Sequence, residues 1–270
     1  MMSKREKRRL RIDELFPLFR CPHCRQELYV SDNDLRCRTG HTFPIAKQGH
    51  VHLLNGKGAD DYSKELFQAR KDVLQEGIYD PLYENLTPLL PEGGTVLDAG
   101  CGEGSHLTAL GKKKTFDGIG IDNAKAAVQM AAAQSDDMVF AAGDLADAPM
   151  VSGRLDGILN VLSPANYTEF KRMLKPEGRV IKVIPNTSYL TELRTAAGKA
   201  PYSNEEVRRG FFDAFPHAEE IHTSWNAPLT PASAALLWKM TPLTWNTAMP
   251  ETFQPETVTI DITILHAFTN

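Results

Sequence analysis

The feature that most constrains the fold of this chain is a glycine-rich turn directly after a short apolar segment. Thr95-Val96-Leu97 favours a β-strand, and the turn that follows reads Asp98-Ala99-Gly100-Cys101-Gly102-Glu103-Gly104. Glycine lets the backbone turn tightly and lets a ligand approach it closely. In doubly wound sheets, ligands bind beyond the carboxyl ends of the strands. The turn therefore predicts an α/β protein with a ligand pocket at this point.

Strand and helix patterns alternate after the turn. Strands are predicted at 118–121, 138–140, 157–162 and 179–184, with helices at 104–111, 124–133 and 167–174 between them. This succession predicts a parallel, doubly wound sheet with helices on both faces. Outside it, helices are predicted at 64–75, 204–214 and, apolar enough for the core, 231–245, and the β-branched segment 258–265 is predicted to be an edge strand.

The glycine spacing and the acids in the turn indicate the ligand. The spacing is G-x-G-x-G, whereas dinucleotide-binding turns have G-x-G-x-x-G. A pyrophosphate favours the positive end of a helix, but S-adenosylmethionine has no phosphate and carries a sulfonium cation. Because Asp98 and Glu103 would attract that cation, the turn favours S-adenosylmethionine over NAD.

Two further acids end the next two predicted strands. Asp122 is placed where a carboxylate can accept both ribose hydroxyls, and Asp144 could accept from the adenine amine. Strand-end Asp residues also cap helices, so a nucleotide-free α/β domain is the alternative. Because the glycine-rich turn, Asp122 and Asp144 follow one another at the ends of three successive predicted strands, we favour the nucleoside pocket of a methyltransferase.

A second cluster of chemistry-bearing residues lies near the N-terminus. Cys21-x2-Cys24 and Cys37-x3-His41 supply the four ligands of a closed, tetrahedral, structural zinc site. His23 is a rival ligand, but its place between two cysteines directs it poorly. Unrelated reduced cysteines are the alternative. A unit this small buries little core, so the metal is expected to stabilise it.

Charge and composition divide the chain into three predicted parts. Residues 1–60 carry 12 Lys and Arg against 7 Asp and Glu, whereas the remainder carries 18 against 27. The basic head would meet a polyanionic partner, unless it is only a solvated tail. We expect a basic arm at 1–20, a zinc-binding domain at 21–58 ending in a linker at 56–58, and a methyltransferase domain at 59–270. With no signal peptide or membrane span in the sequence, a cytoplasmic protein is expected.

The order of these features resembles the 23S ribosomal RNA (guanine-N1)-methyltransferases that modify a hairpin loop in domain II of that RNA. The resemblance covers nearly the whole chain. Its specific part is the zinc unit followed by a Gly-x-Tyr-x-Pro-Leu segment. It rests on the zinc unit, 46–54, Ala69-Arg70-Lys71, Gly77-Ile78-Tyr79-Asp80-Pro81-Leu82, the turn at 96–104, Leu174-Lys175-Pro176-x-Gly178 and Met240-Thr241-Pro242-Leu243-x-Trp245.

The resemblance implies a class I, Rossmann-like fold and several contacts. Tyr79, Cys101 and Gly102 would contact the cofactor, and Tyr189 stands where the family pattern has a histidine. It also implies a homodimer whose zinc units help form a cleft for 23S rRNA.

The target chemistry leaves alternatives open. Guanine N1 must lose a proton, so a general base would help. Asn160, at the end of the fourth predicted strand, could hold the guanine edge or could cap the following helix, and no carboxylate lies there to serve as the base. A small-molecule methyltransferase and a non-catalytic RNA- or ribosome-binding protein are the competing functions.

Overall fold

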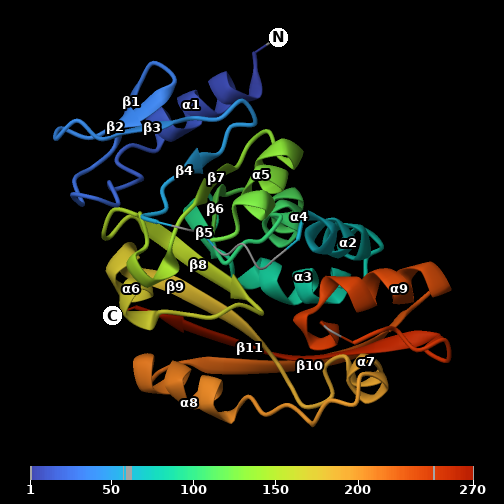
Figure 1. Cartoon of the computed structure of the whole chain (residues 1–270). Helices are drawn as coiled ribbons and strands as arrows, with labels where there is room; N and C mark the ends of the chain where they lie inside the picture. Colours follow the sequence, from blue (N-terminus) through green and yellow to red (C-terminus); the bar gives the residue numbers. More distant parts are fainter. Residues whose placement is uncertain (1, 57, 59–62, 246, 270) are drawn as a thin grey trace.

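The computed structural model describes residues 2–56, 58, 63–245 and 247–269 of the chain. Its centre is an eight-stranded sheet with the order β10-β11-β9-β8-β5-β6-β7-β4 (Figure 1). The middle strand β5 (Thr95–Ala99) pairs in parallel with β6 (Asp117–Asp122) on one side and β8 (Leu155–Val161) on the other. Since β5 and β6 are consecutive in the chain and β8 is not, the strand order reverses at β5, directly beside the glycine-rich turn. β7 (Val139–Ala142) pairs in parallel with β6, and β9 (Leu174–Pro185) pairs in parallel with β8.

The far side of the sheet differs from the prediction. The segment expected at the edge is β11 (Thr257–Phe268), and it is an interior strand between β9 and β10 (Glu219–Pro228), antiparallel to both. The edge prediction was wrong because β10 was not recognised as a strand. Most β10 side chains are exposed or half-buried, so the segment lacks the apolar content that marked the others.

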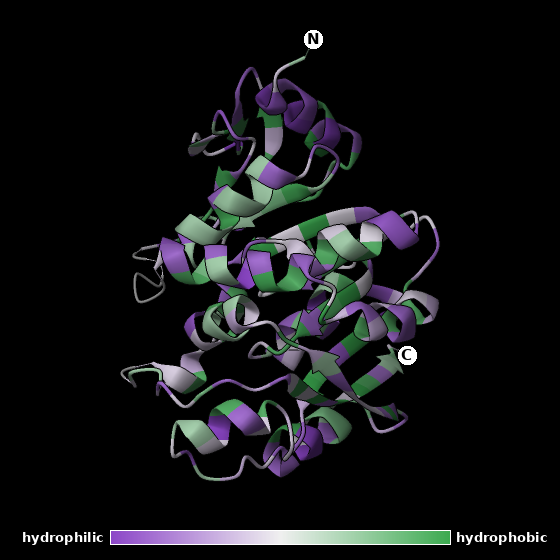
Figure 2. Cartoon of the chain, turned by 90° about the vertical axis from the view of Figure 1, so that its right-hand side faces the viewer, coloured by the Kyte–Doolittle hydropathy of each residue, from purple (hydrophilic) through white to green (hydrophobic). Residues whose placement is uncertain are grey.

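Helices cover both faces, as alternate residues along each strand show. Val96, Leu159 and Ile181 share one apolar core with the helices of one face, whereas Leu97, Ile158 and Val180 share another with the opposite helices. The first face carries α2 (Lys64–Gln75), α3 (Asp80–Leu86), α4 (Ser105–Lys113) and α9 (Pro231–Met240); the second carries α6 (Tyr167–Met173) and α8 (Glu205–Ala214). The other described helices after residue 63 are α5 (Lys125–Gln134), α7 (Thr191–Ala196) and the short 3-10 helices η1 (Thr87–Leu89), η2 (Leu145–Asp147) and η3 (Pro242–Thr244). The doubly wound, Rossmann-like sheet is thereby confirmed. Figure 2 shows apolar residues concentrated in these central strands.

The N-terminal unit is joined closely to this sheet. Strands β1 (Tyr29–Ser31), β2 (Asp34–Arg36) and β3 (Thr42–Pro44) form a small antiparallel sheet. The following strand, β4 (Val51–His52), pairs with β7 and becomes the edge of the large sheet. The predicted domain boundary lies between residues 58 and 59, and residues 59–62 are outside the described part of the chain. Lys57 of the predicted linker is also outside it.

The predicted basic arm at 1–20 contains a docked helix, α1 (Lys4–Glu14). Arg8 is only 1% exposed, and Lys7 Nζ lies 2.8 Å from Asp136 Oδ2 beyond α5. Arg11 pairs with Asp117 of β6. Several charges of the arm are therefore neutralised by the methyltransferase part. No helix among the described residues combines the length and the apolar character needed to cross a membrane.

Candidate functional site: a zinc cluster and two joined cavities

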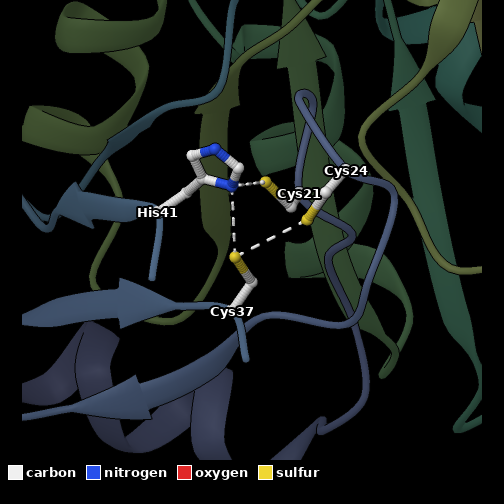
Figure 3. Close-up of side chains that lie close together, drawn as sticks. All are labelled: Cys21, Cys24, Cys37 and His41. Carbon is white, nitrogen blue, oxygen red and sulfur yellow. Dashed lines mark hydrogen bonds between the residues drawn. The ribbon is translucent and has the colours of Figure 1, made fainter. Parts of the chain in front are cut away.

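The four predicted zinc ligands converge on one point (Figure 3). His41 Nδ1 lies 3.5 Å from Cys21 Sγ and 3.4 Å from Cys37 Sγ, and Cys24 Sγ lies 3.6 Å from Cys37 Sγ. All four ligand atoms are within 4.8 Å of one another. A tetrahedron with zinc–sulfur bonds of about 2.3 Å has edges of about 3.8 Å, so the four atoms fit one zinc ion. A site filled by four protein ligands has no open position and is structural.

The surroundings of the cluster distinguish its ligands from their neighbours. The His23 ring stacks on Phe43 with its centroid 5.8 Å away, and His23 is not one of the four converging residues. Thr39, which the sequence did not single out, donates its hydroxyl to Cys24 Sγ at 3.0 Å. The Thr39 hydroxyl also lies 3.0 Å from Cys37 Sγ. Thr39 therefore orients two of the ligand sulfurs through its hydroxyl group.

The glycine-rich turn joins β5 to α4, and two of its glycines are required by close packing. Gly100 has φ +84°, and a Cβ there would collide with the Ser163 side chain after β8. Gly104 has φ +80°, and a Cβ there would lie 2.9 Å from Ala131 of α5. The Cys101 side chain is buried in a core with Phe140 and lines neither cavity described below.

Two buried carboxylates lie behind the turn. Asp98 and Glu103 are each 1% exposed, and no described residue donates a hydrogen bond to either carboxylate. Burial raises the pKa of Asp98 to about 8. Arg70 of α2 is the neighbouring cation, with its Nε 3.5 Å from Glu103 Oε2. Buried acids that receive no hydrogen bond from the protein suit a cationic ligand, and S-adenosylmethionine carries both a sulfonium and an ammonium group.

A cavity of about 470 Å³ lies in front of the turn and is lined by Gly100, Gly102, Asp122 and Asp144. Asp122 accepts hydrogen bonds from the Gly102 amide at 2.9 Å and the Ala124 amide at 2.8 Å. Asp144 is exposed and caps η2 through the Ala146 amide at 2.8 Å. The three predicted strand ends thus meet at one cavity. Asp144 also serves the capping role that was the alternative, whereas α5 after Asp122 has no side-chain cap.

A second cavity, of about 850 Å³, adjoins the first, because Arg70 and Ser163 line both. Tyr79, at the start of α3, and Tyr189, after β9, line the larger cavity, and their hydroxyl oxygens lie 2.5 Å apart. His106 of α4 lines it too, with Nδ1 3.0 Å from the Tyr83 hydroxyl, and burial lowers its pKa well below the usual value.

Asn160 neither lines a cavity, where it could hold the guanine edge, nor caps the following helix. It is fully buried and is absent from the lining of both cavities. Its amide nitrogen donates to the Ala99 carbonyl at 2.7 Å, and its oxygen accepts from Lys182 Nζ at 2.5 Å. The predicted cap of the next helix is supplied instead by Asn166, whose side chain accepts from the Glu169 amide.

Sequence reasoning missed two basic residues at these cavities, although each carries a detectable signal. Arg70 lies on the buried side of α2 among Leu66, Phe67, Val73 and Leu74. Lys182 interrupts the buried run Val180-Ile181-Lys182-Val183-Ile184 of β9. A charged residue in such a position is rare unless it is paired or used.

Comparison with known proteins agrees with this geometry. A family model described as "Methyltransferase domain" matches residues 96–178, and a zinc-ribbon model described as "RlmA, N-terminal" matches residues 19–57. One solved structure, titled for the conversion of a disulfide bond into a thioacetal group during echinomycin biosynthesis, shares the fold. Its TM-score is 0.50 at 17% identity, and the match covers 70% of this chain and 81% of that one. The fold and the site define a class I methyltransferase that uses S-adenosylmethionine and carries a structural zinc site.

Two curated relatives show the family. The chain is 35% identical over 272 residues to a putative 23S rRNA (guanine-N1)-methyltransferase of Bacillus subtilis, covering 93% of this chain and 96% of the relative. It is also 35% identical over 212 residues to the 23S rRNA (guanine(748)-N1)-methyltransferase of Streptomyces fradiae, covering 75% of each. The chain belongs to the 23S rRNA (guanine-N1)-methyltransferase family.

Proposed function

We propose that this protein transfers the methyl group of S-adenosylmethionine to N1 of a guanine in a hairpin loop of domain II of 23S rRNA. The observation that carries the proposal is the 35% identity over 93% of the chain to a relative named for this reaction. The match spans both the zinc unit and the methyltransferase part. The joined cavities support the proposal, because a methyl transfer needs a cofactor and a base side by side.

The smaller cavity is the place proposed for the nucleoside. Asp122 would accept from the ribose hydroxyls and Asp144 from the adenine amine, since both line the cavity and keep carboxylate lone pairs beyond their backbone contacts. Gly102 would let the ligand approach the backbone, because the nearest described side-chain atoms, from Arg70 and Phe67, lie 3.9 Å from the position of its missing Cβ. Asp98 and Glu103 would attract the cationic end from behind the turn.

Tyr79 and Tyr189 are proposed to contact the methionine end of the cofactor, beside Arg70 where the cavities join. The substrate base would enter the larger cavity. S-adenosylmethionine supplies an activated methyl group, so the main task of the protein is to hold the two reactants in line. A loop base can be presented unstacked, and aromatic or Arg side chains can hold it by stacking. Tyr167, Tyr202 and Arg194 line this cavity and offer such surfaces.

The partner and location of the protein follow from the same proposal. The zinc unit would contact the RNA, and two copies would form the cleft as a homodimer. The proposed substrate places the protein in the cytoplasm. Sedimentation of the protein alone and with the hairpin tests the dimer, and we expect two copies of the chain in each particle.

Methylation of a transcript tests the function. The full chain is incubated with S-adenosylmethionine labelled in the methyl group and a domain II hairpin transcript, and each loop guanine is replaced by adenine in turn. Label should enter the RNA and disappear with one replacement only. If the protein binds the RNA but transfers no label, it is a non-catalytic RNA-binding protein. If a cell extract replaces the transcript and label enters only small molecules, the protein is a small-molecule methyltransferase.

A further inference from the structure

Lys182 is a buried lysine that faces the larger cavity. It lies in the middle of β9, is 3% exposed, and lines the 850 Å³ cavity. Placing an amine among apolar strand residues is unfavourable unless the amine is hydrogen-bonded. The neighbouring Ile181 belongs to the apolar core of the opposite face and does not line the cavity, whereas Lys182 and Val183 both line it, and Lys182 is the only one of these three with a polar side chain.

Two acceptors fix the orientation of the amine. Lys182 Nζ donates to Asn160 Oδ1 at 2.5 Å and to the Ser163 carbonyl at 2.8 Å. Asn160 cannot turn its amide around, because its nitrogen already donates to the Ala99 carbonyl at 2.7 Å and the Pro164 carbonyl at 3.2 Å. A neutral amine has two N–H bonds and one lone pair. With both N–H bonds used by protein acceptors, the lone pair is left for a group in the cavity.

The amine lies close to the junction of the two cavities. Ser163, whose carbonyl accepts from Lys182, lines both of them and lies directly against Gly100 of the glycine-rich turn. The hydrogen bond from Asn160 to Ala99 ties the same group to the end of β5. Lys182 is thus held by the segments that form the wall of the proposed nucleoside cavity.

We propose that Lys182 is the general base of the methyl transfer, with its neutral amine accepting the N1 proton of the target guanine; this rests on the proposed function. The N1–H bond breaks and the proton goes to Nζ. The electron pair on N1 forms the bond to the methyl carbon, and the carbon–sulfur bond breaks with its pair going to sulfur. The resulting ammonium keeps its bonds to Asn160 and Ser163 and returns its proton to water.

The electrostatic setting suits this role better than that of other groups in the cavity. Burial lowers the pKa of Lys182 to about 8, so a useful fraction of the amine is neutral near neutral pH. His106 has a pKa lowered well below the usual value by burial and is a weaker base. Burial raises the pKa of Tyr79, Tyr167 and Tyr189, which keeps these phenols protonated. The remaining charged groups of the lining, Arg70, Arg194 and the exposed Glu206, include no buried carboxylate.

Four variants test the proposal in single-turnover methylation of the hairpin with the full chain. Lys182→Met and Lys182→Arg should each lose at least about 100-fold in rate, because Met has no basic atom and Arg stays protonated. Their dissociation constants for S-adenosylmethionine and RNA should stay within about threefold of wild type. Lys182→Ala should regain rate when ethylamine is added, increasingly as the pH rises toward the pKa of the added amine. Lys175→Met is the control, because Lys175 is a half-buried lysine of the same strand that pairs with Asp156 and lines neither cavity, and it should keep the wild-type rate.

The outcomes separate this inference from the function it rests on. A wild-type rate in Lys182→Arg would show that a fixed cation is what the site needs, and it would overturn the proposed base. An unchanged pH–rate profile in Lys182→Met, or no response of Lys182→Ala to ethylamine, would also overturn it, with 1-methylguanosine still formed by wild type. A wild-type protein that forms no 1-methylguanosine would overturn the proposed function as well.

Discussion

Arg70 and Glu103 connect helix α2 to the glycine-rich turn through an ion pair with Nε 3.5 Å from Oε2. The carboxylate is 1% exposed, whereas the guanidinium lines both cavities. The pair therefore places a positive charge beside the two buried acids. Its position explains how two carboxylates without hydrogen-bond donors are tolerated behind the turn.

Removal of the Arg70 charge should destabilise the fold. Arg70→Met would leave Glu103 buried without a cation, and we expect a loss of about 2–3 kcal/mol in the free energy of unfolding, below the usual cost for a broken buried pair because Arg70 is partly exposed. Urea unfolding measures this. Lys71→Met, at the next position of the same helix, is the control. A double variant with Glu103→Gln should recover part of the loss, and additive losses would show that the pair is not coupled.

Binding of S-adenosylmethionine should depend on pH through Asp98. Burial raises the pKa of Asp98 to about 8, so the carboxyl is protonated in the free protein at neutral pH. If the cationic ligand favours the ionised form, binding releases a proton, and the affinity should rise with pH by up to about tenfold per unit until about pH 8. Titration calorimetry between about pH 6 and pH 7.5 gives the slope. Asp98→Asn should bind weakly and without this slope, and a flat wild-type profile would exclude Asp98 from the binding equilibrium.

Two glycines of the turn should respond differently to alanine. Both have positive φ, +84° at Gly100 and +53° at Gly102, so each substitution costs about 1–2 kcal/mol in backbone strain. Only at Gly100 does the new Cβ also collide with Ser163, whereas at Gly102 the nearest atoms are 3.9 Å away. Gly100→Ala should therefore lower Tm more than Gly102→Ala. Gly102→Ala should chiefly weaken cofactor binding, because the methyl group enters the cavity; equal Tm values would contradict the packing argument.

The elements predicted well are those with local signals. The alternation of strands and helices from residue 95 onward follows from hydrophobic period and turn residues, and it places the glycine-rich turn, Asp122 and Asp144 correctly at one edge. The order of β10 and β11 depends on which distant segments pair, and the alternation of Ile221, Thr223 and Trp225 with polar residues, which is typical of a strand, was not recognised. The cavity side chains Arg70 and Lys182 were missed for a related reason, since their use depends on what the tertiary fold places around them.

The N-terminal unit shows the same limit. Its four ligands could be read from the spacing of Cys21, Cys24, Cys37 and His41, because metal geometry restricts the spacing strongly. Its relation to the rest of the chain could not. Phe19 and Leu35 belong to one continuous apolar core with Ile119 of the large sheet, and charge patterns alone gave no sign that α1 docks.

Loss of zinc should loosen this unit while sparing the cofactor site. Cys37→Ala removes one ligand, and amide hydrogen exchange in β1, β2 and β3 should become faster because a unit this small depends on its metal. The dissociation constant for S-adenosylmethionine should change by less than about threefold, since the described residues that line the 470 Å³ cavity begin at Leu66. Cys101→Ala is the control for zinc content and should keep the metal. Zinc retained by Cys37→Ala would contradict the ligand set.

The most direct test of the central claim is the identity of the methylated nucleoside in the RNA. Unmodified 23S RNA is incubated with the protein and S-adenosylmethionine, then digested to nucleosides and analysed by mass spectrometry, with primer extension to locate the modified position. We expect 1-methylguanosine at a single guanine of a domain II hairpin loop, formed only when protein and cofactor are both present. Methyl groups on another base, on another atom of guanine, or on no nucleoside at all would contradict it.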